Sequence, residues 1–89
     1  MRKASVAYNA DTGIEMTTYT DMPAIQLYTG VNLNESNGKD GKAMKKSDGF
    51  CLETQFTPNT PNMPDFPQCI LKKGEEFKSV TKYAFAVAE

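Results

Sequence analysis

The stretch GFCLETQF, residues 49–56, indicates a β-strand with one unusual residue. Side chains alternate between the two faces of a strand, so Leu52 and Thr54 share one face and Glu53 points to the other. Glutamate is a poor strand former, and a carboxylate in a sheet interior costs free energy unless it is paired or hydrogen-bonded. Glu53 therefore either lies on a wet face or has a chemical function. The face to which it points carries Cys51, Glu53 and Gln55.

Two alternating segments near the N-terminus predict a β-hairpin. Residues 3–9, KASVAYN, and residues 13–20, GIEMTTYT, each alternate between two faces, and the turn sequence ADTG joins them. A short Asp/Gly turn between alternating segments is typical of a hairpin. In the second segment, one face is expected to carry Ile14, Met16 and Thr18.

The same pattern predicts strands in the middle and at the end of the chain. In AIQLYTG, residues 24–30, Gln26 and Tyr28 face away from the aliphatic side chains. The last strand is predicted in SVTKYAFAVAE, residues 79–89, which has a dense apolar face. Before it, CILKKGEEF, residues 69–77, indicates a short strand, a Lys-Lys-Gly turn and the start of another strand.

Two long polar segments separate these strands. Residues 30–49 are rich in glycine, asparagine and charged residues and predict a long loop, either a binding segment or a flexible one. Residues 57–68, TPNTPNMPDFPQ, have prolines at a spacing of three, which predicts an extended crossing loop without sheet hydrogen bonds. A polyproline II ligand for an aromatic-lined domain is the alternative. The interspersed asparagines favour a loop that follows one fixed path.

These elements predict an all-β protein, an antiparallel sheet or β-sandwich without α-helices. A chain of 89 residues and 9.8 kDa has room for one domain, so residues 1–89 are expected to form a single partial domain. Because the two loops consume so much of the chain, little remains to cover the second side of the sheet. Exposed strand edges and an exposed apolar face invite pairing with more chain, which indicates part of something larger.

The composition argues against several classes of protein. The net charge is -1 and Arg2 is the single arginine, so no nucleic-acid partner is expected. No apolar run approaches the roughly 18 residues of a membrane span, and the N-terminus turns polar too soon for a signal peptide, so we expect a cytoplasmic protein without a membrane partner. Histidine is absent, and no metal site or cofactor is expected. Cys51 and Cys69 are expected to be free thiols.

Three separated blocks of the sequence occur in the order and spacing of one known family. The blocks are TDMPAIQLYTG (residues 20–30), GFCLETQ (residues 49–55) and PNTPNMPDFPQCILKKGEEFKSVTKYAF (residues 58–85). TGIEMTTYT, residues 12–20, matches the strand that precedes the first block. The chain therefore resembles the C-terminal portion of the aldose 1-epimerase (galactose mutarotase) family.

The resemblance implies a fold, an activity and two site residues. The family fold is a large antiparallel β-sandwich that binds sugar in a cleft on one sheet, and the family interconverts the α and β anomers of a free hexose such as galactose or glucose without a cofactor. Glu53 occupies the position of the family's general base, which removes the proton of the anomeric hydroxyl. Gln26 matches a glutamine that hydrogen-bonds a sugar hydroxyl, a task that suits an amide because it both donates and accepts.

The chain also departs from the family pattern. The family's general acid and a second sugar-contacting residue are histidines on upstream strands, and its sugar-binding arginine and aspartate also lie upstream. Because this chain has no histidine, it is expected to be nearly inactive alone. The alternative is a non-catalytic carbohydrate-binding or interaction module. A further expectation is self-association, or pairing with a separate N-terminal segment that restores the missing sheet.

Overall fold

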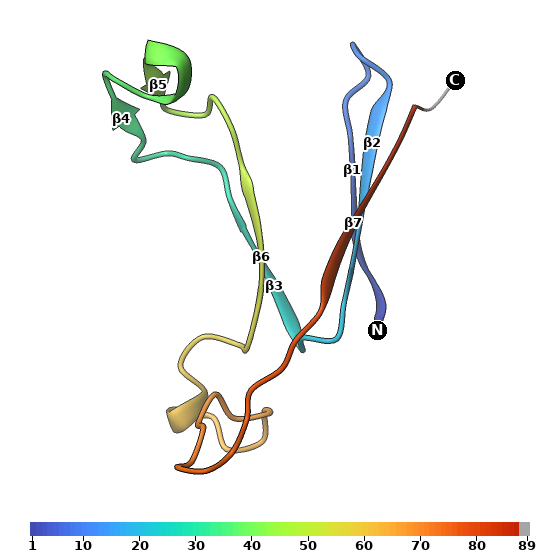
Figure 1. Cartoon of the computed structure of the whole chain (residues 1–89), viewed down its shortest axis with the longest axis vertical. Helices are drawn as coiled ribbons and strands as arrows, with labels where there is room; N and C mark the ends of the chain where they lie inside the picture. Colours follow the sequence, from blue (N-terminus) through green and yellow to red (C-terminus); the bar gives the residue numbers. More distant parts are fainter. Residues whose placement is uncertain (88–89) are drawn as a thin grey trace.

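The computed structural model describes residues 1–87 and places them in strands, two short 3-10 turns and connecting loops (Figure 1). No α-helix occurs in this range, as the sequence predicts, and the fold is all-β. No helix in the described range is long and apolar enough to cross a membrane. The elements are β1 Arg2–Tyr8, β2 Ile14–Thr20, β3 Ala24–Tyr28, β4 Asn34–Glu35, η1 Lys39–Gly41, β5 Met44–Lys45, β6 Cys51–Gln55, η2 Thr60–Asn62 and β7 Thr81–Val87.

The first layer is an antiparallel sheet in the order β1-β2-β7. The predicted hairpin of β1 and β2 is present, and its turn is held by the Asn9 side chain, whose Oδ1 accepts hydrogen bonds from the backbone N–H groups of Asp11 (2.8 Å) and Thr12 (3.2 Å). Gly13 completes the turn with φ 74°, a left-handed conformation that glycine adopts without strain. β7 then joins the free edge of β2 although the 60 residues 21–80 separate the two strands.

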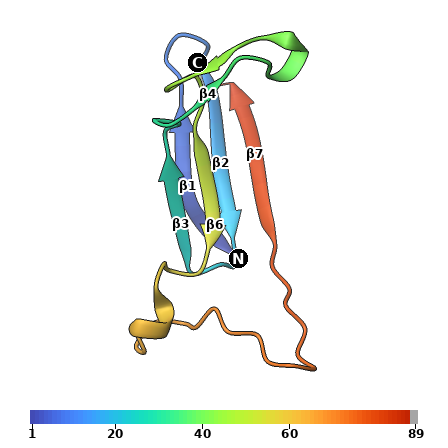
Figure 2. The same ribbon diagram turned by 90° about the vertical axis from the view of Figure 1, so that its left-hand side faces the viewer.

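The second layer consists of β3 and β6, which pair in antiparallel fashion. The sequence predicts a long loop over residues 30–49, which lie between these strands. The structure adds to this segment the paired two-residue strands β4 and β5 and the η1 turn. Figure 2 shows this second layer lying in front of the first, with the strands of the two layers running roughly along the same direction. The arrangement is that of two facing β-layers.

Threonine hydroxyls connect the two layers at one end. The Thr81 Oγ1 lies 3.3 Å from the Thr20 Oγ1 of its own sheet and 2.7 Å from the Thr54 Oγ1 of the other layer. Thr20 Oγ1 also accepts a hydrogen bond from the backbone N–H of Met22 at the corner between β2 and β3. Thr18 and Thr20 are fully buried, and Met22 is the buried hydrophobic residue beside them. This cluster fixes which face of each strand points inward.

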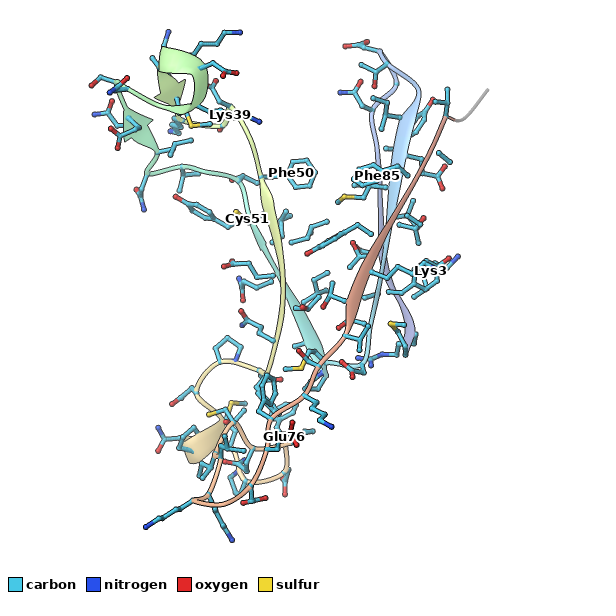
Figure 3. The ribbon with its side chains drawn as sticks, in the orientation of Figure 1. Lys3, Lys39, Phe50, Cys51, Glu76 and Phe85 are labelled. Atoms are coloured by element: carbon cyan, nitrogen blue, oxygen red, sulfur yellow. The ribbon has the colours of Figure 1, made fainter. Side chains whose placement is uncertain are left out.

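The layers diverge away from this corner. Phe50 and Phe85 point toward one another across the space between them (Figure 3), yet Phe50 is 54% exposed and Phe85 is 69% exposed. The Cα radius of gyration is 16.5 Å, whereas a compact domain of this length has about 12 Å. The accessible surface is 7132 Å², whereas a compact monomer of 9.8 kDa exposes about 5,200 Å². The apolar inner faces are therefore open.

The two strand segments predicted within residues 69–77 are absent. Residues 69–77 were expected to contain a short strand and the start of another, and the structure has neither. The backbone N–H of Cys69 donates to Thr60 Oγ1 (3.2 Å) rather than to a neighbouring strand, so the local apolar pattern has no partner with which to form a ladder. The expected turn is present, since the backbone N–H of Glu75 donates to the carbonyl of Lys72 (3.0 Å).

The proline-rich segment, residues 57–68, follows β6 and contains η2, and an irregular segment then leads to β7. Asn59 begins the turn in the left-handed region with φ 65°, and its Oδ1 accepts a hydrogen bond from Asn62 Nδ2 (2.7 Å). Gln68 Nε2 donates to the carbonyl groups of Met63 (3.1 Å) and Phe66 (2.9 Å). Amide side chains therefore hold this segment in one defined path.

Candidate functional site

The two residues singled out in the sequence are direct neighbours in the second layer. Gln26 of β3 and Glu53 of β6 are register partners, although 26 residues of chain separate them. Side chains of directly opposed residues in an antiparallel pair lie on the same face, with Cβ atoms roughly 4.5–5.5 Å apart. Both side chains are exposed. One small ligand can therefore contact the carboxylate and the amide together.

The face on which they lie follows from the contacts between the layers. Thr54 points inward because its hydroxyl meets Thr81 of the first layer, so the adjacent Glu53 points outward. Ile25 is the register partner of Thr54, and Gln26 therefore also points outward. A groove of about 540 Å³ between the layers is bordered by the β6 backbone, and its lining comprises Met16, Phe50, Cys51, Leu52, Glu53, Thr54, Tyr83 and Phe85. The Glu53 carboxylate lies on the other side of β6 from this groove.

Strand alternation and register place four more residues beside this pair. Ala24 pairs with Gln55 on one side, and Tyr28 pairs with Cys51 on the other. The Tyr28 hydroxyl oxygen accepts a hydrogen bond from the backbone N–H of Asn32 (3.3 Å), which ties that side chain to the following loop. We call this surface the outer face of β3–β6, and its residues are Ala24, Gln26, Tyr28, Cys51, Glu53 and Gln55.

The carboxylate and the two amide groups on the outer face are not used by the fold. Within residues 1–87, Lys78 Nζ forms an ion pair with Glu76 Oε2 (3.7 Å), and Glu53 forms none. In the same range no side-chain hydrogen bond involves Gln26, Glu53 or Gln55. A carboxylate flanked by two amides offers acceptors and donors to a neutral ligand rich in hydroxyl groups.

The described part of the chain offers no metal centre. No three Cys, Asp or Glu side chains within residues 1–87 lie close enough together to hold a metal ion. Cys51 and Cys69 are both free and exposed, as expected for unpaired thiols. The chemistry available on the outer face is therefore that of a carboxylate base with amide hydrogen-bonding groups.

Comparison with known sequences identifies the family. The sequence profile of the family described as Aldose 1-epimerase matches residues 1–84. The chain belongs to the aldose 1-epimerase family. Among curated relatives, the galactose mutarotase of Sus scrofa is 45% identical over 82 residues, which cover 91% of this chain and 24% of that protein. The aldose 1-epimerase of Escherichia coli K12 is 36% identical over 84 residues, which cover 92% of this chain and 24% of that protein.

A solved structure agrees with this membership. The aldose epimerase homologue from C. elegans superposes with a TM-score of 0.80 at 28% sequence identity. The match covers 96% of this chain and 27% of the C. elegans chain. The chain thus spans about a quarter of the length of the family members that it matches, and its fold is that of the corresponding part of an aldose epimerase.

The structure adds one residue to the site that the sequence did not single out. Alternation in CLETQ already places Gln55 on the face of Glu53, so the signal is present in the sequence. What the sequence lacks is the register, which places Ala24 opposite Gln55 and Gln26 opposite Glu53. The catalytic role of Glu53 and the sugar-binding role of Gln26 are predictions, developed below.

Proposed function

We propose that this chain supplies the base-bearing part of an aldose 1-epimerase, which interconverts the α and β anomers of a free hexose such as galactose. The observation that carries the proposal is the register pair of Gln26 and Glu53, exposed on one face and without a partner among residues 1–87. Membership of the aldose 1-epimerase family and the similarity to galactose mutarotases support the choice of reaction and sugar.

Glu53 acts on the anomeric hydroxyl in the proposed reaction. Its carboxylate removes the hydroxyl proton while the bond between the anomeric carbon and the ring oxygen breaks, and an acid protonates that ring oxygen. The open-chain aldehyde then rotates about its bond to C2, and the ring closes on the other face of the carbonyl. Gln26 holds a neighbouring hydroxyl so that the anomeric hydroxyl stays within hydrogen-bond reach of the carboxylate.

The general acid of this reaction comes from outside these 89 residues. The chain contains no histidine, and losing general acid help typically costs about 10²- to 10⁴-fold in rate. We propose that further strands, from a preceding segment of a longer polypeptide or from a second chain, cover the open inner faces and bring the acid to the outer face of β3–β6. The excess of roughly 2,000 Å² of accessible surface over that of a compact monomer supports such a completion.

The test is a chimera in which this chain replaces the matching quarter of the Sus scrofa galactose mutarotase. Polarimetry of freshly dissolved α-galactose measures its rate of mutarotation. We expect an active chimera whose kcat falls about 10²- to 10⁴-fold on Glu53→Gln, since the amide keeps the shape but cannot take a proton. An active chimera that is indifferent to Glu53→Gln would refute Glu53 as the base.

The second candidate is a carbohydrate-binding module that performs no catalysis, and the absence of histidine favours it. A module of this kind binds galactose without accelerating mutarotation. Calorimetric titration of the 89-residue chain with galactose, beside polarimetry of the same sample, separates the two functions. Binding by the chain alone, together with a chimera that binds galactose but remains inactive, would favour the module over the enzyme.

A further inference from the structure

We propose that Gln55 is a second sugar-binding amide of this site, which binds a hydroxyl group on the side of the hexose away from the anomeric carbon. The inference rests on the proposed function of Glu53 and Gln26. It adds a residue that sets the affinity for the sugar and contributes little to the chemical step.

The strand geometry places Gln55 at the right separation for one ring. Gln55 follows Glu53 by two residues on β6, so the two side chains share the outer face and lie about 6.5–7 Å apart along the strand. Gln26 is opposite Glu53 and therefore diagonal to Gln55, at about 7–8 Å. The three side chains form a triangle, and a pyranose ring that presents its anomeric hydroxyl to Glu53 can present other hydroxyls to both amides.

The neighbours of the triangle indicate which way the ring extends. On the Gln55 side the opposed residue is Ala24, whose side chain is a single methyl group, and both residues are half-buried. On the other side the opposed residues are Tyr28 and Cys51, and the Tyr28 hydroxyl is held by the Asn32 backbone N–H (3.3 Å). Tyr28 and Cys51 are exposed, and the tethered tyrosine is the bulkiest of these neighbours, so a ring held by Glu53 and Gln26 reaches Gln55 across the small Ala24 side chain.

The Gln55 amide makes no contact that holds the fold, which favours a role in ligand binding over a structural role. Its residue is half-buried, whereas Gln26 and Glu53 are exposed, and its side chain makes no hydrogen bond to other groups of residues 1–87. The buried side-chain atoms without a partner in the described range are Ser5 Oγ and Thr18 Oγ1, so the Gln55 amide is open to water, and a ligand hydroxyl can take the place of that water. Gln68 offers a contrast within the same chain, because its amide donates to two backbone carbonyls and holds a loop.

The experiment compares Gln55→Met with Gln68→Met in the same chimera. Methionine is similar in length to glutamine but lacks the amide, so the two variants lose comparable groups at different places. We expect Gln55→Met to raise KM for galactose roughly 3- to 10-fold, the loss of one neutral hydrogen bond, with kcat changed less than about twofold. Gln68→Met is expected to lower the melting temperature and leave KM unchanged.

A series of monodeoxygalactoses identifies the hydroxyl that Gln55 binds. For one of the analogues deoxygenated at C3, C4 or C6, we expect the parent chimera and Gln55→Met to share the same KM, because either change removes the same hydrogen bond. Equal KM values for galactose in the two proteins, or a Gln55→Met defect of the same size with every analogue, would overturn the inference. Loss of activity in Glu53→Gln remains a separate result, so the proposed function can stand while this inference fails.

Discussion

The hydroxyl oxygens of Thr54 and Thr81 lie 2.7 Å apart and join the two β-layers. This contact orients β6: with Thr54 turned toward the first layer, Glu53 is turned toward the outer face beside Gln26. Thr81 also lies 3.3 Å from Thr20 Oγ1, which in turn donates to the Val80 carbonyl (3.2 Å). The hydroxyl contacts of Thr20, Thr81 and Thr54 therefore hold β6 in the orientation that turns the candidate base outward.

Thr81→Val is expected to destabilise the fold more than Thr54→Val. Replacing Thr54 removes one hydrogen bond, worth about 1 kcal/mol, and leaves Thr81 with its contact to Thr20. Replacing Thr81 costs about 2 kcal/mol because it also leaves the Thr54 hydroxyl without a partner. Urea unfolding of the chimera with each variant measures both free energies. Because the two residues share one bond, the double variant should lose less than the sum, and strict additivity would argue against the contact.

Alternation in the sequence was sufficient to predict the direction of individual side chains. It was not sufficient to predict which strands pair, or in which register. The order of apolar and polar residues around Leu52 and Ile25 correctly placed Glu53 and Gln26 on the face opposite these residues. Their direct opposition depends on the register of two strands joined by a long polar segment, which local patterns do not encode. The strand expected within residues 69–77 was wrong for a related reason, since a local apolar pattern forms a strand only where a partner edge is available.

Galactose is expected to protect Cys51 from alkylation in the chimera. Cys51 is exposed and lies on the outer face two residues before Glu53, so a bound sugar restricts access to its thiol. Cys69 is the matched control, because it is also exposed but lies between η2 and β7, where its sulfur accepts a hydrogen bond from Thr60 Oγ1 (3.2 Å). Peptide mass spectrometry after timed iodoacetamide treatment measures both rates. Equal slowing of both thiols, or of neither, would place the sugar elsewhere.

Asn9→Ala is expected to weaken the first hairpin by about 1 kcal/mol, since the Asn9 Oδ1 accepts two backbone N–H groups in the turn. Asn9→Asp keeps an acceptor oxygen at the same place and should lose much less. Thermal unfolding of the chimera, followed by circular dichroism, gives the comparison. If both variants are equally unstable, the side-chain oxygen is not what holds the turn.

The 89-residue chain alone is expected to self-associate through its open inner faces. Phe85 and Val87 lie on the inward face of β7, the same face as Thr81, and are 69% and 72% exposed. Apolar patches of this kind drive association because burying them gains about 25 cal/mol per Å². Sedimentation velocity over a wide range of concentrations measures the effect, and Phe85→Ser should shift the distribution toward smaller species.

Val6→Ser provides the control for this association. Val6 is 52% exposed but pairs with Thr17 on the opposite face of the first layer, so its replacement should leave the sedimentation profile unchanged. If instead the chain sediments as a monomer at all concentrations and unfolds cooperatively, its inner faces need no cover, and the proposal that further strands complete this fold is wrong.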